Sequence, residues 1–268
     1  MFLQHPCDEP VMANWNNRPC GPIPHRFKEV RNDRRLLAVA RSDIAAFLDF
    51  ETLTQNESLE PSSFEGRERL GSIALPNGDT VLVRAYRHGG LLRGLTRSWF
   101  CSWPPRPFRE LAITEEIRRR GVPTVEVYGA CVAPLAGPFY RGWLLTKELK
   151  GAQDLWTAFQ TGFARTLGID AVLAAVARAL KALHREGVYH RDLNLKNILV
   201  RREADKIGGY VIDFDRAILV LGALPAPLVR KNLSRLLRSV CKLDPRRERL
   251  SETDWNAFLS YYHDAREA

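Results

Sequence analysis

The chain has 268 residues, of which 45% are hydrophobic and 26% are charged, and its formal net charge is +9. This composition fits a folded protein of one large domain or two lobes, and no apolar run is long enough for a transmembrane helix. The opening residues show no secretory signal pattern, and five scattered cysteines without a CxxC pair favour a reduced compartment over a metal-thiolate site. The positive charge leaves nucleic acid, an anionic membrane or an acidic substrate open as partners.

Residues 1–60 are predicted to form an irregular leader with little hydrophobic periodicity. The first part of this segment is rich in Pro, Asn and charged residues. A short helix is expected within "RSDIAAFLDFETL", beginning near Ser42 or Asp43.

Residues 61–150 are predicted to form a small antiparallel sheet with one helix. The runs "GRERLGSIAL" and "DTVLVRAY" flank Asn77-Gly78, which is a strong hairpin signal. A helix is expected over "PFRELAITEEIRRRG", ending at Gly121. Two further strands are expected in "TVEVYGACVA" and "FYRGWLLTKEL".

Residues 151–268 are predicted to be mainly helical, with the boundary between the two parts near Gly151. In "GIDAVLAAVARALKALHREG" the apolar residues Leu173, Val176, Leu180 and Leu183 fall on one helical face. Two more helices are expected, in "LPAPLVRKNLSRLLRSVCKL" and "TDWNAFLSYYHDAREA", after two short strands.

The chemistry is concentrated in "VYHRDLNLKNILV" and the following "VIDFDRA". Asp192 falls in a loop between a helix end and a short strand, where a carboxylate can accept a hydroxyl proton near a reacting phosphate. Asn197 offers a neutral oxygen and Asp213 a charged one, and Mg²⁺ prefers oxygen ligands. These residues therefore indicate a site for nucleotide phosphates and a metal ion.

The same residues carry a resemblance to protein-kinase-like proteins. His190-Arg191-Asp192-Leu193 with Asn197 is similar to their HRDLxxxN catalytic loop, and Asp213-Phe214-Asp215 stands where that fold has Asp-Phe-Gly. The resemblance implies an α+β two-lobe fold, with a small antiparallel-sheet amino lobe and a reduced helical carboxyl lobe. It also implies ATP and Mg²⁺ as cofactors, Asp192 as the catalytic residue, and Asn197 and Asp213 as metal ligands. His190 is expected to pack and form hydrogen bonds within the loop.

The amino lobe should then bind the nucleotide. Gly66 and Gly71 form a weak glycine loop, for which an ordinary turn is the alternative. Arg84 occupies the place of the strand lysine in that fold, and its guanidinium can hold phosphate oxygens. Glu110 is expected to pair with Arg84, whereas Glu115 and Glu116 are expected to be solvated. The hinge strand is predicted in "LLTKEL", where the backbone around Glu148 and Leu149 would bind adenine.

The part of the chain after the second motif indicates the acceptor. Only 53 residues come after Asp215 and no Ala-Pro-Glu occurs among them, which argues against a protein kinase. The chain more closely resembles the lipopolysaccharide kinase family, and within it the enzymes directed at 3-deoxy-D-manno-octulosonic acid (Kdo). The resemblance spans about Gly66 to Leu243 and includes "VLVRAYRHGGLLRGL" and "NLSRLLRSVCKL".

This resemblance implies phosphorylation of a sugar hydroxyl in the Kdo–lipid A inner core, by a peripheral protein at the cytoplasmic face of the bacterial inner membrane. No nucleic-acid partner is expected. A heptose-directed kinase and another small-molecule or protein kinase remain alternatives. Arg84 and the thin glycine loop also leave open a pseudokinase-like binding module without catalysis.

A basic segment runs from Thr80 to Arg109 without any Asp or Glu. Its arginines are Arg84, Arg87, Arg93, Arg97, Arg106 and Arg109, and Trp99, Phe100 and Trp103 lie among them. We expect Arg87, Arg93 and Arg97 to dock on anionic lipid while Trp99 and Trp103 rest in the membrane interface. The alternatives are a solvated basic face and aromatic residues that belong to the core.

Overall fold

The computed structural model describes residues 23–54, 60–61, 71–86, 99–135 and 138–264. The chain divides into two compact units. Unit 1 comprises Met1–Glu115 and Glu126–Glu148, and unit 2 comprises Glu116–Val125 and Leu149–Ala268. The division after Glu148 falls close to the predicted boundary at residues 150 and 151.

Unit 1 is built on a seven-stranded sheet in which every neighbouring pair is antiparallel. Its spatial order is β1-β2-β6-β7-β5-β4-β3. The strands are β1 (Phe27–Asn32), β2 (Leu37–Arg41), β3 (Glu60–Pro61), β4 (Gly71–Ala74), β5 (Thr80–Ala85), β6 (Val127–Pro134) and β7 (Tyr140–Lys147). The predicted hairpin is present, because β4 and β5 pair across a turn in which Gly78 has a φ of +82°.

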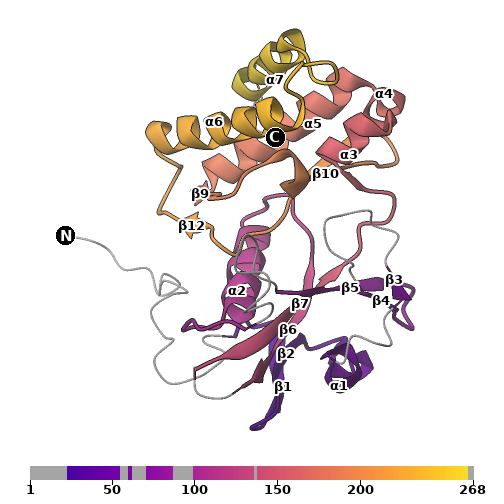
Figure 1. The fold of residues 1–268 in the computed structure, drawn as a ribbon, viewed down its shortest axis with the longest axis vertical. Coiled ribbons are helices and arrows are strands. Elements are labelled where there is room, and N and C mark those ends of the chain that lie inside the picture. Colours follow the sequence, from indigo (N-terminus) through magenta and orange to yellow (C-terminus); the bar gives the residue numbers. More distant parts are fainter. Residues whose placement is uncertain (1–22, 55–59, 62–70, 87–98, 136–137, 265–268) are drawn as a thin grey trace, which may run out of the picture. The chain divides into compact units, whose positions relative to one another are not determined.

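Each face of this sheet carries its own apolar cluster. Helix α2 (Arg106–Arg119) covers one face, where its Phe108 and Leu111 pack with Val127 and Leu144 from the central strands (Figure 1). The other face packs around the buried Leu145, with residues from the short helix that follows β2. Side chains alternate between the two faces of a strand, so both faces of β6 and β7 are buried.

The structure corrects the prediction of an irregular leader over residues 1–60. Residues 27–41 form β1 and β2, which extend the sheet beyond β6. Val39 packs on one face, while Ala38 and Ala40 pack on the other. Alanine is depleted in strands, so "LAVAR" is a weak strand signal even though its residues are buried. Residues 1–22 lie outside the described residues.

The predicted short helix after β2 is present in two pieces and begins later than expected. Asp43 is engaged by Arg41, whose Nε donates a 2.7 Å hydrogen bond to Oδ1, so it does not cap a helix. A 3₁₀ turn η1 (Ala45–Phe47) and helix α1 (Phe50–Thr54) follow instead. Asp49 accepts a 3.0 Å hydrogen bond from a backbone N–H in the first turn of α1, as a helix-capping residue does.

Unit 2 contains the predicted long helices and two small sheets, one of three strands (β11-β10-β8) and one of two (β12-β9). Helix α5 buries the predicted face, with Leu173, Val176, Leu180 and Leu183 all inside. It packs against α7 (Figure 1) and also against β11. The helices are α3 (Leu155–Gln160), α4 (Phe163–Leu167), α5 (Ile169–Arg185), η3 (Leu195–Asn197), α6 (Ala226–Leu243) and α7 (Glu252–Asp264). The strands are β8 (Gln153–Asp154), β9 (Val188–Tyr189), β10 (Ile198–Arg202), β11 (Ile207–Val211) and β12 (Ile218–Leu219).

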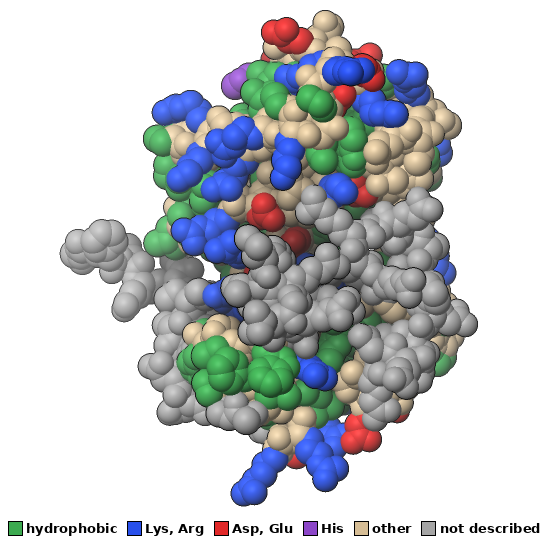
Figure 2. All heavy atoms as spheres, viewed as in Figure 1, with side chains coloured by type: hydrophobic (Ala, Val, Ile, Leu, Met, Phe, Trp, Pro, Cys, Tyr) green, Lys and Arg blue, Asp and Glu red, His purple; other side chains and the backbone are tan. Residues whose placement is uncertain are grey.

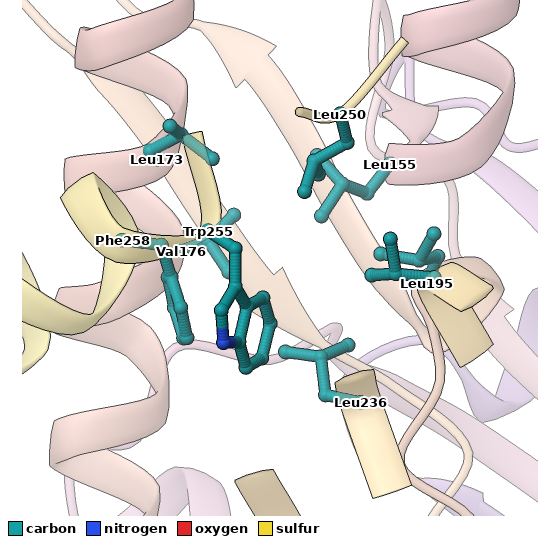
Figure 3. Close-up of a pocket in the computed structure, with 9 residues that line it drawn as sticks. Leu155, Leu173, Val176, Leu195, Leu236, Leu250, Trp255 and Phe258 are labelled. Atoms are coloured by element: carbon teal, nitrogen blue, oxygen red, sulfur yellow. The ribbon is translucent and has the colours of Figure 1, made fainter. Parts of the chain in front are cut away.

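The core of unit 2 contains a small apolar cavity of about 10 Å³. Figure 3 shows Trp255 and Phe258 of α7 side by side at this cavity, with Leu236 of α6 and Leu155 of α3 also at its wall. The ring centroids of Trp255 and Phe258 are 5.0 Å apart. A space of this size holds at most one water molecule, so the cavity is a packing feature of the core. Within the described residues, no helix is long and apolar enough to cross a membrane.

Candidate active site

The predicted catalytic loop follows β9 in unit 2 and is anchored by two leucines. Leu193 and Leu195 are buried, whereas the neighbouring Asp192 is exposed. The backbone N–H of Leu195 also donates a 3.2 Å hydrogen bond to Oγ of Ser239 in α6. The apolar core therefore holds the loop in place and leaves the side chain of Asp192 accessible from solvent.

His190 connects this loop to the segment after β11, as the prediction of a structural role for it requires. Its Nδ1 accepts a 3.2 Å hydrogen bond from the backbone N–H of Asp192, and its Nε2 donates a 3.0 Å bond to the Ile212 carbonyl. This pattern assigns the proton to Nε2 of a neutral imidazole. Burial lowers the pKa of His190 and so favours that neutral form.

Two asparagine side chains fix the backbone at Asp192. Nδ2 of Asn194 and Nδ2 of Asn197 each donate a 2.9 Å hydrogen bond to the Asp192 carbonyl oxygen. Because the amide nitrogen of Asn197 is used in this way, its Oδ1 is the atom left to meet an external cation. Hydrogen bonding thus orients the predicted ligand oxygen.

Asp213 lies at the same end of a hairpin as Asn197. Ile198, the first residue of β10, pairs with Val211, the last residue of β11. The next rung is a 3.0 Å hydrogen bond from the Ile212 N–H to the Asn197 carbonyl. The hairpin register therefore brings the two predicted metal ligands, Asn197 and Asp213, to one open end.

The backbone at Asp213 is strained, with a φ of +68°. This left-handed conformation costs a residue with a side chain about 1 kcal/mol or more, although Asp adopts it more readily than most. The next residue, Phe214, is fully buried, and its ring centroid is 5.3 Å from that of His190. The left-handed backbone at Asp213 thus occurs next to a buried Phe214 that packs on His190. Backbone strain of this kind is often found at functional sites.

The catalytic loop is also held by a buried asparagine of α6, to which the sequence analysis assigned no role. Asn232 of α6 is fully buried, and its Nδ2 donates a 2.7 Å hydrogen bond to the His190 carbonyl. Its Oδ1 accepts a 3.2 Å bond from the His190 N–H. The only signal in the sequence is a polar residue in the apolar phase of an amphipathic helix.

The polar network continues from Asn232 to His184 and Tyr262. His184 Nε2 lies 3.2 Å from Oδ1 of Asn232, and its Nδ1 lies 2.7 Å from the Tyr262 hydroxyl. Burial lowers the pKa of His184 to about 4 and raises the pKa of Tyr262 to about 12. Both groups are therefore neutral near pH 7, and the network carries no net charge into the core.

In unit 1, Arg84 and Glu110 form the predicted ion pair. Nη2 of Arg84 on β5 lies 2.6 Å from Oε1 and 2.5 Å from Oε2 of Glu110 on α2. The Glu110 side chain is 2% exposed, that of Arg84 is 28% exposed, and the Tyr86 hydroxyl also donates to Glu110. The buried carboxylate thus fixes the guanidinium while part of Arg84 reaches solvent.

The two neighbouring glutamates are less solvated than expected. Glu115 is buried and lies 3.6 Å from Nη1 of Arg26 in unit 1. Glu116, in unit 2, forms ion pairs of 2.8 Å with both Arg119 and Arg120 one turn along the chain. Each therefore has a local structural partner, which leaves Glu110 as the partner of Arg84.

The two predicted glycines differ in what the structure says of them. Gly66 lies outside the described residues. Gly71 is the first residue of β4 and pairs with Val83 of β5. A role for these glycines in holding phosphate remains a prediction.

The predicted hinge follows β7. The backbone N–H of Glu148 donates a 2.8 Å hydrogen bond to the Thr80 carbonyl, and the Leu149 carbonyl accepts a 3.0 Å bond from Ala152. These two backbone groups are already engaged. An adenine contact at this segment would therefore use its other backbone groups, and this contact also remains a prediction.

Comparison with known proteins decides the family. A sequence model of the lipopolysaccharide kinase (Kdo/WaaP) family matches residues 54–262. The chain belongs to the lipopolysaccharide kinase (Kdo/WaaP) family. It is therefore a phosphotransferase with an alcohol group as acceptor, a kinase of lipopolysaccharide core biosynthesis.

Individual relatives within the lipopolysaccharide kinase family agree. The chain is 32% identical over 189 residues to 3-deoxy-D-manno-octulosonic acid kinase of Pasteurella multocida, which covers 69% of this chain and 76% of the relative. It is 32% identical over 204 residues to the enzyme of that name from Vibrio vulnificus, covering 75% and 81%. It is 33% identical over 188 residues to that of Xanthomonas campestris pv. campestris, covering 69% and 70%.

A solved structure of WaaP in complex with acyl carrier protein matches the fold with a TM-score of 0.52. The two chains are 21% identical, and the match covers 86% of this chain and 89% of the other. The likeness confirms the predicted α+β, protein-kinase-like two-lobe fold. Its amino lobe is the antiparallel sheet of unit 1, and its carboxyl lobe is the helical unit 2.

The donor set at the hairpin end fits the magnesium ion that kinase chemistry implies. Among the residues described, no three or more His, Cys, Asp or Glu side chains gather as a metal cluster. A nucleotide-bound Mg²⁺ does not require such a cluster, because phosphates and water supply most of its ligands. The amide oxygen of Asn197 and the carboxylate of Asp213 are the hard oxygen donors that Mg²⁺ prefers.

The aromatic residues of the basic segment divide between surface and core. Trp99 is 49% exposed and Trp103 is 62% exposed, and Trp99 lies beside the exposed Phe139 with ring centroids 6.3 Å apart. Phe100 is instead buried in the core of unit 1, where it stacks near Tyr140. The three arginines expected to bind lipid, at positions 87, 93 and 97, lie outside the described residues.

Proposed function

We propose that this chain is an ATP- and Mg²⁺-dependent kinase that phosphorylates a hydroxyl of Kdo in the Kdo–lipid A inner core. The observation that carries the chemistry is the hairpin register that brings Asn197 and Asp213 to one end, with the Asn197 amide held on the Asp192 backbone. The relatives named as Kdo kinases support the acceptor, because three of them are 32–33% identical over most of their length.

In this proposal Asp192 orients the attacking sugar hydroxyl and accepts its proton as the phosphoryl group is transferred. Its exposed side chain and fixed backbone suit that role. Oδ1 of Asn197 and the carboxylate of Asp213 would hold the metal. When bound, Mg²⁺ neutralises charge on the phosphate oxygens and helps to orient the nucleotide.

The nucleotide would be held by unit 1. Arg84 would contact phosphate oxygens, and Glu110 would keep its guanidinium in position, since Glu110 is buried and lies on the supporting helix. Gly66 and Gly71 would lie near the phosphates, and the backbone near Glu148 and Leu149 would meet the adenine. Replacing lysine by arginine at this position gives a planar donor that can bind two oxygens at once.

The proposed acceptor would bring the enzyme to a membrane. Kdo carries a carboxylate and lipid A carries phosphates, so an acid-free basic segment suits this substrate. We propose that the protein works peripherally at the cytoplasmic face of the bacterial inner membrane. The exposed Trp99 and Trp103 support contact with the lipid interface, where tryptophan is enriched.

The direct test is phosphotransfer with purified protein, ATP and Mg²⁺, followed by mass spectrometry of the acceptor. Kdo–lipid A should gain the mass of one phosphate, and a heptose-bearing acceptor that lacks free Kdo hydroxyls should not. Asp192→Asn should lose turnover but still bind ATP, since it is not assigned to the nucleotide. If only the heptose acceptor is phosphorylated, the substrate is heptose and not Kdo. Nucleotide binding without any transfer would indicate a binding module.

A further inference from the structure

Helix α6 of unit 2 carries a strongly basic surface that the phosphotransfer chemistry does not use. From Arg216 to Leu243 the chain has no Asp or Glu. Figure 2 shows Lys and Arg side chains gathered over the part of unit 2 where Figure 1 draws α6. The basic residues of this stretch are Arg216, Arg230, Lys231, Arg235, Arg238 and Lys242.

Four of these residues form a stripe along one face of α6, which we call the α6 stripe: Lys231, Arg235, Arg238 and Lys242. Their spacing of i, i+4, i+7 and i+11 places them within about 60° of the helix circumference, over a length of about 16 Å. The residues that α6 buries, Asn232, Leu236 and Val240, lie on a different face, centred about 130° around the helix from the stripe. Lys231, Arg238 and Lys242 are exposed, so the stripe faces solvent.

The charge of the α6 stripe is not neutralised within the described part of the protein. No ion pair joins any of its four residues to an acidic group there, although arginines elsewhere, such as Arg41 and Arg119, do form such pairs. Nε of Arg235 is buried and has no hydrogen-bond partner among the described residues. Four adjacent positive charges without counter-charges attract an anionic surface.

An apolar loop precedes the helix and presents a leucine to solvent. Leu221 is 94% exposed and Ile218 is 41% exposed. The loop does not lie free, because β12 pairs with β9 and the Leu224 N–H donates a 2.7 Å hydrogen bond to the His184 carbonyl. On the near side of the tip, the Val220 N–H donates a 2.9 Å bond to the Gly187 carbonyl. Anchored on both sides, the loop tip holds Leu221 outward.

We propose that the α6 stripe and the Leu221 loop dock unit 2 on an anionic phospholipid bilayer. The proposal rests on the proposed function only in that the acceptor is a glycolipid, and it adds a second contact to the one proposed for Trp99 and Trp103. Lipid phosphates would bind the stripe, and Leu221 would enter the interface between head groups and acyl chains. A basic helix face beside an exposed apolar tip is typical of peripheral membrane proteins.

The presence of both the basic α6 stripe and the exposed Leu221 favours a bilayer over an acidic protein as the partner. Charge alone would serve either partner, but a fully exposed leucine at a fixed loop tip gains nothing in water. A bilayer offers anionic groups above an apolar interior, so it satisfies both parts of the surface at once. The binding should weaken with salt, because the screening length falls from about 10 Å at 0.1 M to about 3 Å at 1 M.

The test is co-sedimentation of the full chain with vesicles of phosphatidylglycerol and phosphatidylethanolamine, compared with vesicles of phosphatidylcholine alone. Each basic residue at an anionic surface changes partitioning roughly fivefold, so the triple variant Lys231→Ala, Arg238→Ala, Lys242→Ala should bind roughly a hundredfold more weakly. The matched control removes the same charge from three other exposed sites of unit 2, Arg165→Ala, Arg178→Ala and Lys206→Ala. It should keep most of the binding.

A second variant tests the apolar part. Leu221→Ser leaves the charge unchanged and should reduce binding to anionic vesicles at both about 0.1 M and about 1 M salt. The proposal is wrong if the triple variant binds like the parent, if the control loses as much binding, or if an acidic protein binds the stripe while vesicles do not. Phosphotransfer to detergent-solubilised Kdo–lipid A separates the two proposals. The triple variant should still transfer phosphate to this soluble acceptor. If the parent protein transfers none, the result would count against the proposed function and not against docking.

Discussion

Asn232 is predicted to be the residue on which the catalytic loop depends most, although it is remote from the chemistry. In Asn232→Ala, the N–H and the carbonyl of His190 and Nε2 of His184 lose their partners in a buried place. Each unsatisfied buried polar group costs about 1–3 kcal/mol. Partial relaxation brings the expected loss of unfolding free energy to about 3–5 kcal/mol.

Urea denaturation followed by circular dichroism measures this loss. The matched control is Ser239→Ala on the same helix, which removes one hydrogen bond to Leu195 and should cost about 1 kcal/mol. If Asn232→Ala unfolds within about 1 kcal/mol of Ser239→Ala, the network does not support the loop as described.

Three further outcomes are expected from the structure. Arg84→Ala removes the guanidinium that pairs with the buried Glu110 carboxylate, and it should lower the free energy of unfolding by about 3 kcal/mol. The double variant Arg84→Ala, Glu110→Gln should regain part of this loss, as measured by thermal unfolding. His184 has a pKa of about 4 in the folded protein against 6.5 in the unfolded chain, so its contribution to the free energy of unfolding is complete above pH 6.5 and is lost as pH drops toward 4, by up to about 3 kcal/mol. In pH-dependent denaturation, His184→Gln should lack this part of the slope and so be flatter than the parent. Asp213→Gly should be more stable than Asp213→Ala by about 1 kcal/mol, because the φ of +68° suits glycine, while phosphotransfer assays should find both inactive; equal stability would contradict the backbone strain.

The elements with strong local signals could be predicted from the sequence. The Asn77-Gly78 hairpin and the apolar face of α5 are present as expected, because turn chemistry and helical periodicity are properties of a few neighbouring residues. Strands β1 and β2 could not be predicted in this way. Their burial depends on β6, which lies far along the chain, and Ala38 and Ala40 are poor strand signals by themselves.

In the site, too, local sequence patterns predict some residues but not the contacts between distant segments. The motif residues Asp192, Asn197 and Asp213 could be selected because their spacing resembles a known catalytic loop. The partner of Arg84 could be narrowed to Glu110 by its place early in the helix. Asn232 could not be assigned its role, because its partners lie 42 and 48 positions away and no local pattern links them. Contacts of this kind depend on the packing of α6 beneath the loop.

The proposed phosphorylation of Kdo can be tested in cells, by mass spectrometry of the lipopolysaccharide core from a strain that lacks the gene and from the same strain carrying it on a plasmid. The proposed function predicts that the core of the deleted strain lacks one phosphate on Kdo. The parent gene should restore that phosphate, and a gene carrying Asp192→Asn should not, even though the variant protein accumulates. An unchanged Kdo phosphate in the deleted strain, or its restoration by the Asp192→Asn gene, would contradict the proposed function.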